Sequence, residues 1–385
     1  MMKELLFVCY GLGIGGIEKC LVNLINALPE DKFNIDLLLM NPEYDLQSQI
    51  KRKINFIDRY KYVMNTTDTM NDISAHGGIL KNIGTFIRYC CFRVSVKLDL
   101  KPWKWFIQLP KKYDVAIAYS HHDYSKYYVI EKTTANKKYL FYHDGVYKLN
   151  NTQKKRDHVY YPLFTGIVAV SRCTRDMLLS IYPEIHNKVI VLYNIINDSE
   201  IKEKANECIP SNEAHVFNIV TVGRMVNQKQ PDVAVEIAKM LKEKGYKFKW
   251  QWIGDGPLYQ RIKEMVEEYE LKDYFIMRGN QLNPYPYMRH ANLYVQPSRD
   301  EAYCTTTNEA RILNKVIVAT DCSGMDEQII NGVTGIITCN SIDEICQAIE
   351  YFINHLDKLQ EFEDNVQKSL PRFSDYVNDY YGLFQ

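Results

Sequence analysis

Residues 4–18 read Glu-Leu-Leu-Phe-Val-Cys-Tyr-Gly-Leu-Gly-Ile-Gly-Gly-Ile-Glu, so an apolar run passes through a glycine-rich turn into a second apolar pattern. That second pattern has helical spacing, with apolar side chains at positions 17, 21, 24, 25 and 28. A buried strand, a glycine turn and an amphipathic helix in this order are typical of the first unit of a doubly wound α/β domain.

The same alternation of apolar runs and helical patterns continues along nearly the whole chain. One hydrophobic core stops growing at about 250–300 residues, so a chain of 385 residues predicts two domains. Parallel strands are expected at residues 4–9, 34–40, 114–119, 138–142, 166–170 and 188–193, and then at 217–222, 248–253, 274–277, 292–296, 316–319 and 334–338.

The polar stretch 197–215 has no apolar periodicity and is predicted to be the linker between the domains. Near the C-terminus, apolar and aromatic residues at 373, 376, 377, 380 and 381 repeat at helical spacing. We therefore expect an N-terminal domain at 1–197, a C-terminal domain at 198–365, and a helix within 366–385 that returns to the N-terminal domain.

The composition is that of a soluble globular protein, with 46% hydrophobic and 24% charged residues. Lys and Arg number 47, as do Asp and Glu, so the chain lacks the strongly basic field of a nucleic-acid binder. The ten cysteines show no zinc-ligand spacing, which favours a reducing, cytoplasmic compartment. No run of eighteen apolar residues predicts a spanning helix, and the N-terminus lacks a signal-peptide cleavage site.

The first glycine loop has three interpretations that the sequence leaves open. Gly11, Gly13 and Gly16 satisfy G-x-G-x-x-G, so the loop could bind a dinucleotide. A nicotinamide enzyme also needs an acid at the end of the second strand, whereas Asp36 lies near the beginning of that strand. The loop could instead face a phosphate or a sugar, or it could be a purely structural turn.

The stretch that follows the strand 292–296 is Pro297-Ser-Arg-Asp-Glu301-Ala-Tyr-Cys-Thr-Thr-Thr-Asn-Glu309-Ala310. Glu301 is predicted in a loop and Glu309 in a helix whose start near 305–307 carries hydroxyl side chains suited to capping. The free amides of this helix could receive a diphosphate. The alternative is an ordinary loop with two solvated acids.

Two cations follow the strand 217–222. Arg224 offers a planar donor fork and Lys229 a compact charge, a combination that suits phosphate oxygens. Gly254, Gly279 and Asn280 follow the next two strands and are expected at the same edge of the sheet. The alternative is that these are ordinary surface charges near loops.

Taken together, these motifs resemble the retaining GT-B glycosyltransferases of the "glycosyltransferases group 1" family. The resemblance covers essentially the whole chain and is strongest from 218 to 338. It implies two Rossmann-like doubly wound domains facing a cleft, the N-terminal one binding the acceptor and the C-terminal one a nucleotide sugar. No cofactor is implied, because the nucleotide sugar is a substrate.

The resemblance also implies roles for individual residues. The implied catalytic residues are Glu301, Arg224, Lys229 and His143. Glu301 would hold the donor sugar, Arg224 and Lys229 would bind the diphosphate, and His143 would lie near the reacting sugar. Glu309 would hold the ribose. The remaining donor contacts would be Gly15, Gly16, Gly223, Gly254, Asn280, Ala302, Tyr303, Cys304 and Thr305.

The implied reaction transfers a hexose with retention of configuration, with a UDP-sugar as the expected donor and a glycan or lipid-linked molecule as the acceptor. Cell-surface polysaccharide or glycoconjugate synthesis is the expected setting. No metal is expected, because no Asp-x-Asp pair occurs to hold one. Ala302 and Cys304 stand where the family usually has glycines, and Gln230 stands where a glycine is common. An NAD(P)-dependent oxidoreductase and a catalytically silent nucleotide- or sugar-binding homologue remain as alternatives.

Residues 81–112 combine eight basic residues and one acid with interleaved aromatic side chains. Basic and tryptophan side chains together favour lying on an anionic membrane surface, so a peripheral position on the inner face of the plasma membrane is one expectation. The alternatives are that the aromatic residues belong to the core and that the cations are solvated or meet an anionic acceptor.

Overall fold

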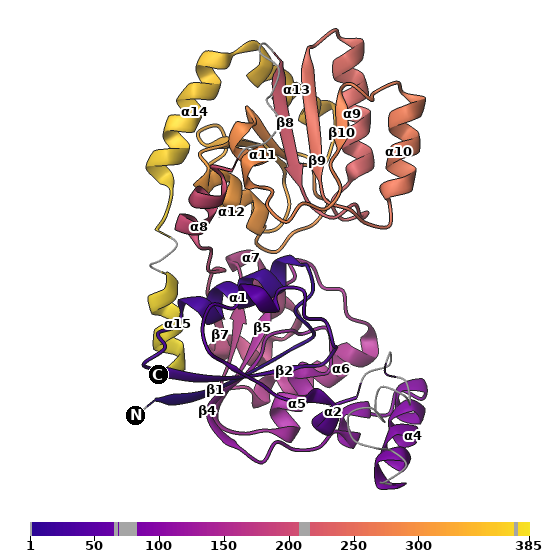
Figure 1. Cartoon of the computed structure of the whole chain (residues 1–385), viewed down its shortest axis with the longest axis vertical. Helices are drawn as coiled ribbons and strands as arrows, with labels where there is room; N and C mark the ends of the chain where they lie inside the picture. Colours follow the sequence, from indigo (N-terminus) through magenta and orange to yellow (C-terminus); the bar gives the residue numbers. More distant parts are fainter. Residues whose placement is uncertain (1, 65–67, 69–82, 208–215, 373–375) are drawn as a thin grey trace. The chain divides into compact units, whose positions relative to one another are not determined.

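The computed structural model describes residues 2–64, 68, 83–207, 216–372 and 376–385. Its contacts divide the chain into two units (Figure 1). The N-terminal unit comprises Met1–Ile195 with Tyr376–Gln385, and the C-terminal unit comprises Ile196–Asp375. The boundaries between the units thus fall after residues 195 and 375, whereas the sequence predicted them after residues 197 and 365.

The N-terminal unit is built on a seven-stranded parallel sheet with the strand order β3-β2-β1-β4-β5-β6-β7. Its strands are β1 (Lys3–Cys9), β2 (Phe33–Leu39), β3 (Asn55–Phe56), β4 (Lys112–Ala118), β5 (Thr134–Tyr142), β6 (Gly166–Ala169) and β7 (Val189–Val191). Its helices are α1 (Gly16–Ala27), α2 (Arg59–Tyr62), α4 (Ile83–Lys97), α5 (Ser125–Lys132), α6 (Asn151–Tyr160), α7 (Arg172–Ile181) and α15 (Tyr376–Phe384).

The C-terminal unit has a six-stranded parallel sheet with the equivalent order β10-β9-β8-β11-β12-β13. Its strands are β8 (Phe217–Val222), β9 (Phe248–Ile253), β10 (Phe275–Met277), β11 (Leu293–Gln296), β12 (Val316–Thr320) and β13 (Gly335–Thr338). Its helices are α8 (Asp198–Lys204), α9 (Pro231–Glu243), α10 (Tyr259–Glu268), α11 (Tyr285–His290), α12 (Thr305–Ile312), α13 (Ile342–Asn354) and α14 (Leu356–Ser369). Each unit therefore has the strand order of the doubly wound Rossmann fold, and this part of the predicted fold class is confirmed.

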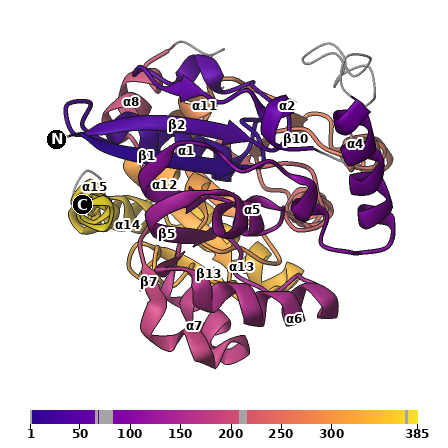
Figure 2. The same ribbon diagram turned by 90° about the horizontal axis from the view of Figure 1, so that it is seen from below.

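The strands form where the sequence predicts them because parallel strands are covered on both faces and so read as continuous apolar runs. Leu5, Leu6, Phe7 and Val8 in β1 are all fully buried. In Figure 2, β1 and β2 run side by side, as their parallel pairing requires. The two-residue strand β3 was not predicted, because so short a segment has no periodicity.

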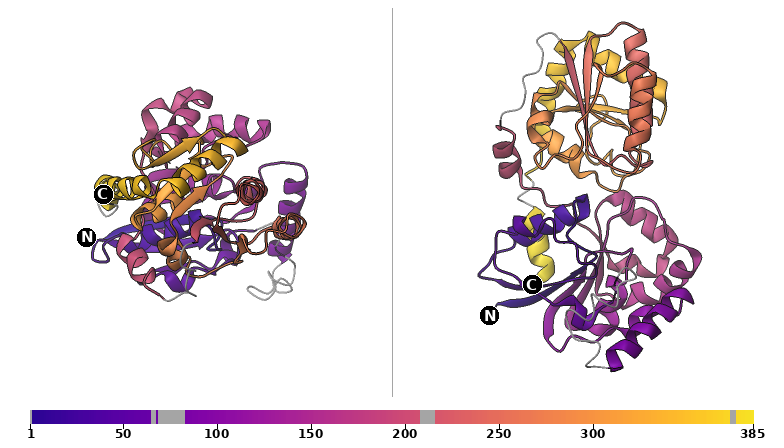
Figure 3. Two further views of the ribbon diagram at one scale, coloured as in Figure 1. Left: turned by 90° about the horizontal axis from the view of Figure 1, so that it is seen from above. Right: turned by 45° about the vertical axis from the view of Figure 1, so that its right-hand side comes forward.

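The helix α15 belongs to the core of the N-terminal unit although it ends the chain. Phe384 is fully buried and meets Phe7 edge to face, with ring centroids 6.1 Å apart. The Tyr380 hydroxyl donates to the carbonyl of Tyr193 at 3.0 Å. Figure 3 shows this helix beside the N-terminal strand. It begins at Tyr376, whereas residues 366–369 still belong to α14.

The segment 197–215, predicted as the linker between the domains, contains α8. Asn197 caps this helix by accepting from the backbone N–H of Glu200, and Ile201 is buried. Residues 208–215 of the predicted linker lie outside the described residues. In the described ranges every cysteine is a free thiol, and no helix there combines the length and apolarity needed to cross a membrane.

Candidate functional site

In the C-terminal unit, the strand order reverses between β8 and β11, which are neighbours in the sheet. Ligands of doubly wound sheets bind beyond the carboxyl ends of the strands at this point. The loop after β8 and the loop after β11 meet there. The Gln228 side-chain amide donates to the Asp300 carbonyl at 2.8 Å, and the Arg299 N–H donates to the Gln228 carbonyl at 2.8 Å. Two predicted site segments, about 70 residues apart in sequence, are thus held together.

The centre of this site is an ion pair between Lys229 and Glu301. Both side chains are mostly buried, with 18% and 8% of their surface exposed. The Ser298 hydroxyl donates a further hydrogen bond to Glu301 Oε1 at 2.7 Å. Burial lowers the pKa of Lys229, but the Glu301 carboxylate, with smaller contributions from Cys304 and Cys322, raises that pKa above its usual value. The Lys229 ammonium is therefore charged at neutral pH. Arg224, the other predicted cation of this loop, is exposed and lies two residues beyond the end of β8.

The glycines of the next loop allow it to pack against the loop after β8. Gly254 has φ +138°, and a Cβ there would lie 2.2 Å from the Gly223 carbonyl oxygen. The Trp252 indole N–H donates to that same oxygen at 2.9 Å, and the Gly254 N–H donates to the Gly279 carbonyl at 2.8 Å. Asn280, next in the chain, is exposed. Gly223, Gly254 and Asn280 are therefore placed at one edge of the sheet.

Glu309 lies on α12, as predicted, and is only 2% exposed. The Tyr285 hydroxyl donates to its Oε1 at 3.3 Å. The predicted capping of this helix by threonine is wrong, because the N-cap residue is Cys304 and no side chain caps it. Ala302, Tyr303 and Cys304 are buried in the approach to the helix, and Thr305 is half-buried at its first position.

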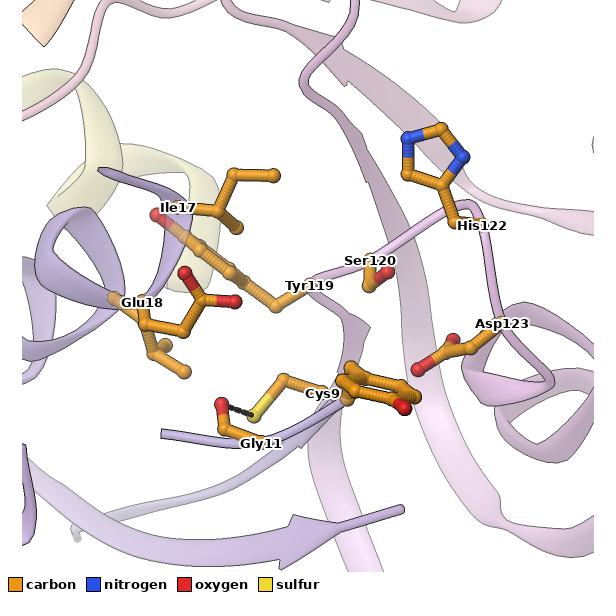
Figure 4. Close-up of a pocket in the computed structure, with 10 residues that line it drawn as sticks. Cys9, Gly11, Ile17, Glu18, Tyr119, Ser120, His122 and Asp123 are labelled. Carbon is orange, nitrogen blue, oxygen red and sulfur yellow. Dashed lines mark hydrogen bonds between the residues drawn. The ribbon is translucent and has the colours of Figure 1, made fainter. Parts of the chain in front are cut away.

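In the N-terminal unit the corresponding reversal lies between β1 and β4, and a pocket of about 290 Å³ is found there (Figure 4). The carboxylates of Glu18, from α1, and Asp123, from the loop before α5, project toward it. Burial, followed by the nearby carboxylates of Asp123 and Glu18, raises the pKa of the Cys9 thiol well above its usual value. The pocket is therefore an environment that disfavours a further anion.

Acids also surround the glycine loop itself. A Cβ on Gly15 would lie 2.1 Å from a carboxylate oxygen of Glu18, and one on Gly13 would lie 2.8 Å from a carboxylate oxygen of Glu43. Asp36 is buried and accepts from the Tyr113 hydroxyl at 2.7 Å, so it has no role at a ribose. Gly15, the N-cap residue of α1, therefore faces a protein carboxylate, which argues against a dinucleotide diphosphate at this loop.

His143 follows β5 and is buried. Burial lowers the pKa of its imidazole to about 4, and its Nε2 has no hydrogen-bond partner. Its backbone N–H donates to His121 Nδ1 at 3.5 Å. The imidazole at this position is therefore neutral at pH 7 and has an unsatisfied polar atom.

Beside His143 lies a cluster that the sequence analysis missed, made of His121, His122 and Asp144. Asp144 Oδ2 lies 3.0 Å from His122 Nε2 and 3.5 Å from His121 Nε2. Of the residues that the structure describes, these form the one group of His, Cys, Asp or Glu close enough to hold a metal ion. His121 accepts at Nδ1, so Nε2 carries the proton, and metal binding at Nε2 would require the opposite tautomer.

Comparisons with known proteins give a family match for part of the chain and a fold for all of it. Residues 209–369, less than half of the chain, match the family "Glycosyl transferases group 1". An uncharacterized glycosyltransferase of Methanocaldococcus jannaschii is 24% identical over 167 residues, which are 42% of this chain and 41% of that protein. The chain spans roughly half the length of the curated relatives that it matches first.

Two further proteins resemble the whole chain. The N-acetylgalactosamine-N,N'-diacetylbacillosaminyl-diphospho-undecaprenol 4-alpha-N-acetylgalactosaminyltransferase of Campylobacter jejuni is 23% identical over 98% of this chain and 97% of its own. The crystal structure of Anabaena HepE in complex with UDP and glucose superposes with a TM-score of 0.72 at 14% identity, covering 100% of this chain and 99% of that one.

The chain therefore has the GT-B fold, with two Rossmann-like units. Residues 209–369 of its C-terminal unit match the glycosyl transferases group 1 family, and the resemblance to that family identified from the sequence is confirmed.

Proposed function

We propose that the chain is a retaining glycosyltransferase that moves a hexose from a nucleotide sugar, with UDP as the expected nucleotide, to a glycan or lipid-linked acceptor. The observation that carries the proposal is the Lys229–Glu301 pair at the switch point of the C-terminal sheet, with Arg224 exposed in the same loop after β8. The names of two relatives support it, since HepE was crystallised with UDP and glucose and the Campylobacter enzyme is named for an undecaprenol-linked substrate.

The difficult step is the departure of the nucleoside diphosphate from the anomeric carbon. Arg224 and Lys229 place two positive charges where the leaving phosphate gains negative charge, which is electrostatic stabilisation of the transition state. Glu301 would hold the donor sugar hydroxyls and Glu309 the ribose. The acceptor hydroxyl attacks from the side of the leaving group, whose phosphate takes its proton, so no protein base is required.

The remaining parts of the proposal concern the surroundings of this step. His143 would contact the reacting sugar through its unsatisfied Nε2. Gly15 and Gly16 would approach the donor, although Glu18 must first turn away from Gly15. The diphosphate would be bound without a metal, because protein cations already supply the charge. A lipid-linked acceptor would place the protein in the cytoplasm at the inner face of the plasma membrane.

The experiment that tests the proposal is calorimetric titration with UDP, preceded by a thermal-shift panel of UDP-, GDP-, ADP- and dTDP-sugars. Replacing Arg224 by Ala should weaken UDP binding by about 1.5–3 kcal/mol, the range for a hydrogen bond between charged groups. Arg261→Ala is the matched control, because Arg261 is an exposed arginine of the same unit. An Arg224→Ala variant with the parent affinity would refute the assignment.

The same panel separates the alternatives. A nicotinamide enzyme would bind NAD(P)H with a change in cofactor fluorescence, although the carboxylates of Glu18 and Glu43 at the glycine loop disfavour this. A silent homologue would bind the nucleotide sugar but would neither transfer nor hydrolyse it. Release of UDP from the donor over time therefore distinguishes an enzyme from a binding protein.

A further inference from the structure

Exposed apolar side chains concentrate in one part of the N-terminal unit, the helix α4 and the turn that follows it. Of the large hydrophobic side chains that are exposed in the described ranges, seven lie between residues 86 and 107: Phe86, Ile87, Val94, Leu98, Leu100, Trp105 and Ile107. Figures 1 and 2 show α4 at the periphery of its unit. Such a concentration of apolar surface marks an interaction site.

The structure separates the core residues of this segment from its exposed ones. Phe92, Trp103 and Phe106 are buried, so the core interpretation is correct for these aromatic side chains. Leu98 and Leu100 are 58% and 60% exposed. The outward-facing side chains are thus a distinct set, and the packing of the unit does not account for them.

The outward set is held in place by the fold. Ile87 and Val94 are seven residues apart and lie on one face of α4. Leu98 directly follows the helix and continues this face, because its N–H donates to the Val94 carbonyl at 2.9 Å. The indole N–H of Trp105, at the end of the short helix η3 (Pro102–Trp105), donates to Ser95 Oγ on α4 at 2.8 Å. Trp105 is therefore fixed beside the helix while 38% of its surface stays exposed.

The charges around this face are positive. Lys97, Lys101 and Lys104 are exposed, and the one acid of the segment, Asp99, is neutralised by an ion pair with Arg156 at 2.9 Å. Two basic residues counted in the sequence do not contribute. Lys111 is paired with Glu4 and Asp36, and Lys81 lies outside the described residues.

We propose that the face formed by Val94, Leu98, Leu100, Trp105 and Ile107, with Lys97, Lys101 and Lys104 around it, docks on an anionic lipid bilayer. Exposed leucines and a tryptophan enter the interface of a bilayer, and lysines around them meet anionic headgroups. The inference rests on the proposed function only in the purpose of docking, which is to reach a lipid-linked acceptor.

The position of the tryptophans allows a direct test. Trp103, Trp250 and Trp252 are fully buried, so Trp105 is the one exposed tryptophan of the four in the chain. With vesicles of phosphatidylglycerol and phosphatidylcholine, brominated acyl chains should quench the Trp105 part of the fluorescence. The Trp105→Phe variant should bind without this quenching.

Charge is tested by cosedimentation with the same vesicles. One lysine near an anionic surface contributes about a fivefold gain in partitioning, so the triple variant K97Q/K101Q/K104Q should bind about 100-fold more weakly. The control is K32Q/K51Q/K53Q, which removes three exposed lysines from another part of the same unit. The vesicle affinity of this control variant should stay within about threefold of that of the parent, since its three lysines lie outside the proposed face.

The outcomes separate this proposal from its rivals and from the proposed function. Equal loss in the two triple variants, or bound protein without quenching of Trp105, would overturn docking through this face. A dimer in lipid-free buffer that L98S/L100S dissociates would assign the face to a second copy of the chain. UDP titration checks the fold of each variant, and UDP binding with no vesicle binding would overturn docking alone.

Discussion

Replacing Lys229 by Met should destabilise the C-terminal unit strongly, because the Glu301 carboxylate would stay buried without its partner. The Glu301 side chain is 8% exposed, and after the replacement its Oε1 would keep the hydroxyl of Ser298 as its close donor. Breaking a buried pair from one side costs about 3–5 kcal/mol. Glu301→Gln should cost less, about 1.5–3 kcal/mol, since the longer Lys229 side chain is 18% exposed and can turn toward water.

The double variant K229M/E301Q should recover most of the loss, because neither charge is then left buried alone. Hydrogen exchange of the amides of β8 and β11 at increasing urea, followed by mass spectrometry, measures the unfolding of this unit by itself. A cost below about 1 kcal/mol for Lys229→Met, or a larger cost for Glu301→Gln, would show that the pair is solvated and that this reasoning is wrong.

The pH dependence of the unfolding free energy of the C-terminal unit follows from the raised pKa of Lys229. A group whose folded pKa is raised contributes stability that is complete below its unfolded pKa and is lost as the pH rises through the folded value. The difference between the parent and Lys229→Met should therefore be constant from about pH 6 to pH 9. If this difference in unfolding free energy already declines between about pH 6 and pH 9, the pKa of Lys229 is not raised, and the buried pair with Glu301 does not stabilise its charge.

The other predictions concern the sugar, the metal and the C-terminal helix. Glu301→Gln should lower sugar transfer at least about 100-fold while changing UDP affinity little, and transfer at the parent rate would make Glu301 a bystander. UDP affinity by calorimetry should be the same in magnesium and in EDTA, and a strict magnesium requirement would contradict binding of the diphosphate by protein cations. Phe384→Ala should destabilise the N-terminal unit by about 3–5 kcal/mol, since Phe384 is fully buried against Phe7. Exchange of the β1 amides should rise accordingly, and unchanged protection would mean that α15 is dispensable.

The sheet could be predicted from the sequence because its signal is local. A parallel strand is buried on both faces, so a mostly apolar run such as Phe217–Val222 is visible in the sequence and matches β8 residue for residue. The start of α12 was predicted near 305–307 and lies at Thr305, but the capping of the helix could not be predicted in the same way. Thr305, Thr306 and Thr307 suit an N-cap by type, but backbone geometry places the cap at Cys304, where the side chain forms no capping bond.

The side-chain environment of each site residue depends on contacts that are distant in sequence. Lys229 and Glu301 were assigned to separate roles, and their ion pair arises because β8 and β11 are neighbours in the sheet. His121 and Asp144 meet for the same reason, since β4 and β5 pair in parallel. Helical spacing likewise could not separate the buried Trp103 from the exposed Trp105, because the turn after α4 decides which ring faces the core.

The two units show how one architecture can present opposite charge at equivalent places. Each sheet reverses its strand order at its first strand, and loops with glycines follow that strand in both units. In the C-terminal unit that loop carries Arg224 and Lys229, whereas in the N-terminal unit the acids Glu18 and Asp123 line the equivalent pocket. A diphosphate is stabilised by the first arrangement and repelled by the second, while the hydroxyl groups of a sugar can donate to carboxylates. The charge at the switch points therefore supports a donor nucleotide in the C-terminal unit and an uncharged, hydroxyl-rich ligand in the N-terminal unit.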